Sequence, residues 1–168
     1  MENIEDLSRE DLLKLIKMYA KNWLAHDGCW FIAAEEKYDM DTAIDLDKKS
    51  WERFAVTEAR RIMNEFDIPK EGGLKALEKA FSFRLYAAIN KQKVEWADEN
   101  KMRFFMLECR VQKTRHDKNM PLFPCKQVGI IEFTQFAKTI DPRIKVTSIS
   151  CPPDPVDDYY CGWEFTIE

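Results

Sequence analysis

The hydrophobic period of this chain changes near residue 90, and that change constrains the fold more than any single motif does. Before it, apolar residues recur every three or four positions, which is the period of an amphipathic helix. After it, residues 91–96 and 102–112 alternate polar and apolar around a turn at 98–100, which is typical of a β-hairpin. A run of helices followed by antiparallel strands predicts an α+β protein.

The predicted order is a layer of about four helices and then β-β-α-β-β, which forms an antiparallel sheet. The first helix is expected to start at the Ser8 cap and to end at Gly28, and others are expected over 29–38, 42–66 and 74–89. Asp41 is the predicted cap of the third helix. After the hairpin we expect a fifth helix over 125–139 and two strands, 144–151 and 160–167, joined by a Pro-rich turn.

The chain is expected to form a single domain over 1–168. Its helical part is 1–90, and the part over 91–168 holds the sheet, one helix and the cysteine motifs. A length of 168 residues suits one domain, and a hydrophobic fraction of 45% is sufficient for a core. The net charge of -4, with scattered Lys and Arg, argues against a nucleic-acid partner.

No apolar run approaches the ~18 residues that a spanning helix needs, so no membrane partner is expected. The acidic start over residues 1–6 differs from the basic and then apolar start of a secretory signal. We therefore expect a cytoplasmic protein with reduced thiols. The sequence leaves the oligomeric state open, with a homodimer among the alternatives.

Four of the five cysteines are Cys109, Cys125, Cys151 and Cys161. They fall where the second strand ends, the fifth helix starts, the third strand ends and the last strand starts. In an antiparallel arrangement these four points meet at one end of the sheet. Cys109 and Cys161 are expected on apolar strand faces that also carry Phe105, Leu107 and Val111, and Trp163, Phe165 and Ile167 respectively.

Three interpretations of these cysteines remain open. The thiols bind zinc, through four sulfurs or three plus another ligand, although no Cys-x-x-Cys spacing is present. Alternatively, Cys125 is reactive, because a helix start and nearby Arg110, Arg115 or Lys126 lower its pKa. Otherwise all four pack as small buried side chains. Cys29, on an apolar helix, is expected in the core.

Charged residues supply the other candidates. Arg110 and Arg115 precede the loop and are suited to an anionic ligand, although a solvated loop explains them equally well. Asp47 and Glu58 flank the apolar stripe of the third helix, and either is a candidate to face a pocket alone; pairing with Arg60 or Arg61 is the alternative for Glu58. Glu132 lies two turns after Cys125, and it is the carboxylate expected to activate a water beside the cysteines.

Two sets of residues resemble the pattern of a family of uncharacterised prokaryotic cytosolic proteins. The first is Trp30-Phe31, Glu35, Tyr38, Asp47, Trp51 and Glu58-Ala59; the second is Cys109-Arg110-Val111-Gln112, Phe123-Pro124-Cys125-Lys126, Cys151-Pro152-Pro153-Asp154 and Cys161-x-Trp163-Glu164-Phe165. The family is associated with a further cysteine where this chain has Ser148. More distantly, the chain is similar to L-2-amino-thiazoline-4-carboxylic acid hydrolase-like proteins. It also looks like the small-molecule-binding domains of the vinyl-reductase type.

These resemblances imply a protein that binds a small, anionic molecule between its helices and sheet. The enzymatic version is a hydrolase of a cyclic amidine or amide C–N bond, with Cys125 and Glu132 as catalytic residues. Its rivals are a non-catalytic module that senses a metal, a ligand or the redox state, and a structural or partner-binding subunit.

Overall fold

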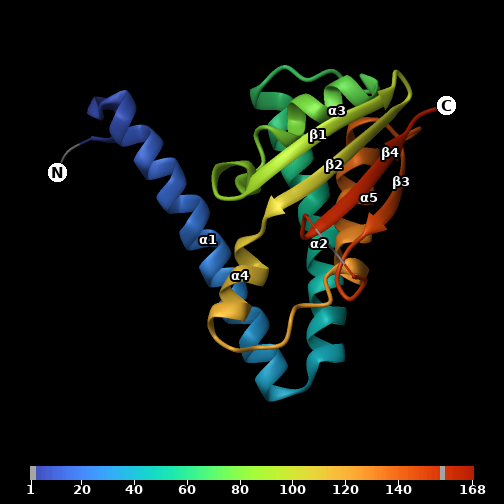
Figure 1. Cartoon of the computed structure of the whole chain (residues 1–168). Coiled ribbons are helices and arrows are strands. Elements are labelled where there is room, and N and C mark those ends of the chain that lie inside the picture. Colours follow the sequence, from blue (N-terminus) through green and yellow to red (C-terminus); the bar gives the residue numbers. More distant parts are fainter. Residues whose placement is uncertain (1–2, 156–157) are drawn as a thin grey trace.

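The computed structural model describes residues 3–155 and 158–168, and its helices followed by one antiparallel sheet confirm the α+β class (Figure 1). Residues 1–2 of the acidic start and 156–157 of the predicted Pro-rich turn lie outside the described residues. The helical elements are η1 (Ile4–Asp6), α1 (Arg9–Lys37), α2 (Met40–Glu65), α3 (Gly73–Phe81), η2 (Leu85–Ala88), α4 (Arg110–Asp117) and α5 (Lys126–Ile140). The strands are β1 (Lys91–Asp98), β2 (Lys101–Glu108), β3 (Lys145–Ser150) and β4 (Cys161–Thr166).

α1 starts where the sequence predicts but does not end at Gly28. The Ser8 Oγ accepts a hydrogen bond from the Asp11 amide at 3.1 Å, which satisfies one free N–H of the first turn. The predicted helix over 29–38 is the second half of α1. A single interior glycine costs a helix only about 1 kcal/mol, and the inner face continues across it from Trp23 to Phe31.

α2 begins two residues earlier than predicted. Asp39, not Asp41, is its N-cap, and the Asp39 Oδ1 accepts a hydrogen bond from the Thr42 amide at 2.7 Å. Because only two residues separate Lys37 from Met40, α1 and α2 form a hairpin.

The helix predicted over 74–89 is also interrupted. α3 ends at Phe81, and η2 follows after Arg84, whose backbone is extended with φ -67° and ψ 150°. The Arg84 side chain is only 4% exposed, so the break turns a guanidinium into the interior. Two buried carboxylates receive it there, and this contact stabilises the break over a continued helix.

The strands lie in the order β1-β2-β4-β3, and every neighbouring pair is antiparallel. At the centre, Met102 is opposite Phe165 and Phe104 is opposite Trp163. All four side chains are buried. The predicted apolar face of the last strand is therefore the face that packs on the helices.

The second strand is shorter than predicted and uses its other face. β2 ends at Glu108, and the residues predicted as strand and loop after Cys109 form α4. The core-facing residues are Met102, Phe104 and Met106, whereas Phe105 and Leu107 are only partly buried. Both alternating sets over 102–107 contain apolar residues, so alternation alone could not select the inner face.

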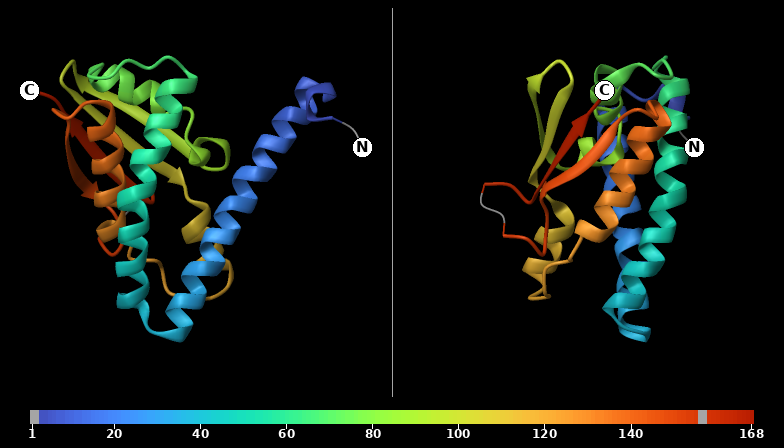
Figure 2. Two further views of the ribbon diagram at one scale, coloured as in Figure 1. Left: turned by 180° about the vertical axis from the view of Figure 1, so that it is seen from behind. Right: turned by 90° about the vertical axis from the view of Figure 1, so that its right-hand side faces the viewer.

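The helices cover one face of this sheet (Figure 2). α5 packs between α2 and the strands, and a cluster of aromatic rings joins α3, α5 and the central strands: Phe81, Phe104, Phe133, Phe136, Trp163 and Phe165. α1 packs on the body from about Ala20 onward, and its first turns extend away from it (Figure 1).

Candidate functional site

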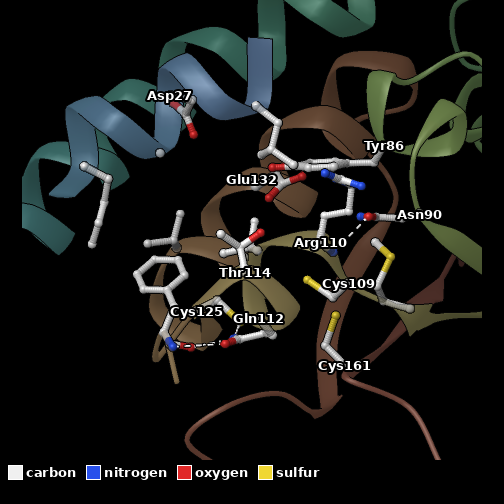
Figure 3. Close-up of a pocket in the computed structure, with 18 of the residues that line it drawn as sticks. Asp27, Tyr86, Asn90, Cys109, Arg110, Gln112, Thr114, Cys125, Glu132 and Cys161 are labelled. Carbon is white, nitrogen blue, oxygen red and sulfur yellow. Dashed lines mark hydrogen bonds between the residues drawn. The ribbon is translucent and has the colours of Figure 1, made fainter. Parts of the chain in front are cut away.

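A pocket of about 380 Å³ lies where the second half of α1 meets α2, η2, α4, α5 and the sheet (Figure 3). Most of its wall is apolar: Leu24, Phe31, Ile32, Trp51, Phe104, Met106, Val111, Phe123, Val128, Phe133 and Trp163. Ligand sites in proteins combine such walls with a few convergent polar groups. The polar groups of this pocket fall into an ionic group, a pair of acids, a set of thiols and the start of α4.

Arg84 is the centre of the ionic group. Its Nη2 lies 2.8 Å from the Glu58 Oε2 and 2.7 Å from the Glu132 Oε1, and its Nε donates to the Glu58 Oε2 at 2.9 Å. Burial disfavours its charge, but the two carboxylates outweigh this and raise the pKa of Arg84. The guanidinium also lies 4.6 Å from the centre of the Phe136 ring.

This arrangement gives the two predicted glutamates different positions. Glu132 lines the pocket, and burial raises its pKa although Arg84 opposes that shift. Glu58 is not among the pocket-lining residues, and it serves as the second counter-ion of Arg84. The triad joins α2, the residue before η2, and α5, and two of its members, Arg84 and Glu132, line the pocket.

Asp47 lines the same pocket from α2, together with Asp27 and Glu132 and not alone. Burial raises its pKa to about 7, and repulsion from Asp27 and Glu132 adds to the shift, while a hydrogen bond with Trp51 opposes it. Asp27 comes from α1, and burial raises its pKa too, although His26 opposes that shift. The pocket therefore holds a carboxyl group that changes charge near neutral pH.

All four C-terminal cysteines line this pocket, and Cys125 and Cys151 are in contact with 3.4 Å between their Sγ atoms. The neighbouring Cys151 thiol lowers the pKa of Cys125, and a hydrogen bond of 3.5 Å from the Gln112 Nε2 contributes. Burial raises the pKa of Cys109 to about 12. Hydrogen bonds with Cys125 and Cys161 raise the pKa of Cys151. Cys125 is thus the thiol whose pKa its neighbours lower, which makes it the candidate thiolate of this pocket.

The elements that carry these cysteines differ in part from the expected ones. Cys109 is the N-cap residue of α4 and not a strand residue, while Cys125 is the N-cap residue of α5. Figure 3 shows the sulfurs of Cys109 and Cys161 on one side of the pocket. Among residues 3–155 and 158–168, no group of three or more Cys, His, Asp or Glu side chains is arranged to hold a metal ion. Cys29, expected in the core, is exposed on α1.

The two candidate arginines also separate. Arg115 is 5% exposed; its Nη1 and Nη2 bind both carboxylate oxygens of Glu35, at 2.9 and 3.1 Å, and its Nε donates to the Pro121 carbonyl at 2.6 Å. It therefore fastens α4 and the following loop to α1. Arg110 is exposed, and its side chain extends toward Tyr86 (Figure 3).

Sequence reasoning missed Asp27, Tyr86, Asn90 and Gln112 in the wall of the pocket. Gln112 is 1% exposed and holds the loop before α5, because it donates to the Phe123 carbonyl at 2.7 Å and accepts from the Phe123 amide at 3.0 Å. For Asp27 a signal existed: it lies four residues after Trp23 and four before Phe31, on the inner face of a continuous α1.

Fold and site together define an α+β protein with an amphipathic pocket between its helical layer and its sheet. The family described as "Family of unknown function (DUF6125)" matches residues 5–167, so the chain belongs to this family. No curated protein matches the chain, and no solved structure does. In the part of the chain that the structure describes, none of the helices is both long enough and apolar enough to cross a membrane.

Proposed function

We propose that this protein binds a small organic molecule in the pocket between α1, α2, α5 and the sheet. The observation that carries the proposal is a cavity of about 380 Å³ with apolar walls and a few polar groups at fixed positions. Cavities of roughly 300–1,000 Å³ with this composition are the usual form of a small-molecule site. Free thiols at all five cysteines agree with a cytoplasmic location, which we propose as well.

The chemistry of the free polar groups suggests an anionic group on this ligand. Arg84 and Arg115 are ion-paired, whereas Arg110 has no ion pair among the described residues. The Asn90 Nδ2 is buried without a hydrogen-bond partner in the same part of the chain, and the Asn90 Oδ1 accepts from the Arg110 amide at 3.1 Å. A carboxylate or a similar acceptor beside Arg110 would supply the missing partner.

An anionic aromatic dye, 8-anilinonaphthalene-1-sulfonate, tests this site by fluorescence titration. We expect saturable binding that Val111→Trp, which fills the pocket, weakens by about tenfold or more. Arg110→Gln should weaken binding by about five- to tenfold, since it removes a charge-assisted contact. The control is Ile149→Trp, a similar enlargement at an exposed position of β3, and it should leave the affinity unchanged. Equal binding by the Val111→Trp variant would place the dye elsewhere and contradict the proposal.

The enzymatic form of this proposal is a hydrolase of a cyclic amidine or amide C–N bond, in line with the resemblance to thiazoline carboxylate hydrolases. It draws support from two groups in one pocket, the Cys125 thiol with its lowered pKa and the Asp47 carboxyl with a pKa of about 7. The Cys125 thiolate would add to the ring carbon, and the C–N bond would break as the nitrogen takes a proton from Asp47. Water would then release the product and restore the thiol. Glu132, ion-paired with Arg84, would position these groups.

Ring opening adds one water to the substrate, so mass spectrometry detects it directly. A panel of five-membered cyclic amidines and amides would be incubated with the protein and with its Cys125→Ser and Cys29→Ser variants. We expect conversion by the wild type and by Cys29→Ser, which removes another thiol of the pocket wall, and none by Cys125→Ser. Conversion that survives Cys125→Ser would exclude this mechanism without affecting the binding proposal.

The second candidate function is redox sensing, favoured by the 3.4 Å between the Cys125 and Cys151 sulfurs. A peroxide would oxidise the Cys125 thiolate to a sulfenic acid and be reduced to water or alcohol. The Cys151 thiol would then attack the sulfur of this sulfenic acid, form a disulfide and release water. Treatment with dilute hydrogen peroxide should lower the mass by about 2 Da through one Cys125–Cys151 link. A link between other cysteines, or sulfenic acid alone, would argue against this function.

A further inference from the structure

The first half of α1 presents an apolar face that the rest of the described chain does not cover. Ala20 is the one buried residue of this 29-residue helix. Leu13, Ile16 and Tyr19 are 48%, 55% and 57% exposed. Figures 1 and 2 show this half of the helix extending away from the sheet and from α2.

The exposed face continues the face that packs on the body. Successive residues of a helix are about 100° apart, so Leu13, Ile16, Ala20, Trp23, Leu24 and Asp27 fall within an arc of roughly 100°. Trp23 packs on the core, and Leu24 and Asp27 line the pocket. The same stripe therefore serves as packing surface from Ala20 onward and is uncovered at Leu13 and Ile16.

We propose that a second copy of this chain covers this face, with the first halves of the two α1 helices packed antiparallel and crossing near Ile16. The stripe is self-complementary in that arrangement, because a two-fold axis near Ile16 brings Ile16 of the two copies together and sets Leu13 of each copy beside the turn of the other that ends at the already buried Ala20. The charged residues along α1 also favour the antiparallel pair. Acidic Glu10 and Asp11 lie at the start of the helix and Lys17 and Lys21 lie further along.

This charge distribution selects the antiparallel orientation. Glu10 and Lys21 flank the apolar stripe on the same side of the helix, since eleven residues correspond to about three turns. In the antiparallel pair, Glu10 of one copy lies beside Lys21 of the other at both ends of the contact. A parallel two-fold pair would instead place the Glu10 and Lys21 flanks of the two copies on opposite sides of the contact, where these charges do not meet. Association of two copies is a property separate from the ligand binding proposed above.

Sedimentation equilibrium measures the result directly. At about 100 µM, a concentration that favours even a small interface, we expect twice the chain mass of 19.9 kDa. Ile16→Glu places a charge at the crossing point and should give 19.9 kDa. Met18→Glu is the matched control: Met18 is 46% exposed but about 200° around the helix, so this variant should remain a dimer. Circular dichroism melting establishes that both variants are folded.

A charge exchange tests the orientation. Glu10→Lys and Lys21→Glu should each weaken the dimer by about threefold to tenfold, and the double variant should restore it. A wild-type protein of single-chain mass at this concentration would overturn the proposal. So would an Ile16→Glu variant that dimerises like the wild type, and failure of the double variant would overturn the antiparallel orientation. Sedimentation measures these outcomes without the dye, so failure of the dimer and failure of dye binding are distinguishable.

Discussion

Replacing Asp47 with asparagine should stabilise the protein at neutral and alkaline pH, although it removes a charge from the candidate site. Asp47 lines the pocket, and burial together with Asp27 and Glu132 raises its pKa from 3.8 to about 7. A carboxyl group with a raised pKa in the folded state favours folding in its protonated form. The folding penalty of its ionisation is therefore absent below about pH 4, and it grows until the pH exceeds about 7.

The size of the effect follows from the two pKa values. A shift from 3.8 to about 7 corresponds to a penalty of about 4 kcal/mol once both states are ionised. Between about pH 5 and about pH 8, the wild type should lose about 2.5 kcal/mol of unfolding free energy through this group alone. The side chain of the Asp47→Asn variant is neutral throughout, and its amide oxygen still accepts the hydrogen bond from Trp51.

Urea unfolding of the wild type and of Asp47→Asn at these two pH values measures the prediction. The difference between the two profiles of unfolding free energy against pH isolates the contribution of Asp47, because Asp27 and Glu132 are present in both proteins. Asp45→Asn is the control, since this aspartate is on the same helix and its side chain is 69% exposed. Profiles of the wild type and Asp47→Asn that run parallel within about 0.5 kcal/mol would refute the raised pKa and remove the basis for Asp47 as a proton donor.

Three further substitutions test the packing around the pocket. Gly129→Ala should lower the unfolding free energy by about 1–3 kcal/mol, because its Cβ would lie 2.6 Å from Cζ2 of the buried Trp163. Gly28→Ala, in open space on α1, should raise it by about 0.5–1 kcal/mol, and thermal melts that gave both variants the same sign would contradict the described contact. Arg84→Met should lower it by about 3–5 kcal/mol by leaving two buried carboxylates without their cation, and part of this loss should be recovered at acidic pH as Glu132 is protonated. Equal urea midpoints at neutral pH for Arg84→Met and the wild type would show that the triad is not stabilising.

The sequence predicted those helix ends that a capping side chain or a proline defines. Ser8 starts α1, and Asp141 before Pro142 ends α5, because a side-chain cap and a proline act within a few residues. Gly28 misled the prediction because the same residue type ends some helices and is tolerated inside others. The difference depends on the contacts of the whole helix, which local composition does not contain.

The candidate site depends still more on contacts between distant residues. Asp47, Glu132 and the cysteines of the wall carried a sequence signal, since each lies on an apolar stripe or beside a turn residue. Nothing in the spacing indicated that Arg84 leaves its helix to join residues 58 and 132. The spacing also did not indicate that Arg115, a candidate for ligand binding, pairs with Glu35, which lies 80 positions earlier.

The uninterrupted α1 makes one rigid rod of the uncovered stripe and the pocket wall. Ile16 and Asp27 are about 16 Å apart along its axis, with no kink or loop between them to absorb a displacement. Any event that reorients the free half therefore moves Asp27 and Leu24 relative to the sheet. Ligand affinity and the state of the free half are then thermodynamically linked, and each alters the other by the same factor. Binding constants measured on this protein should consequently depend on its own concentration if the free half is where copies meet.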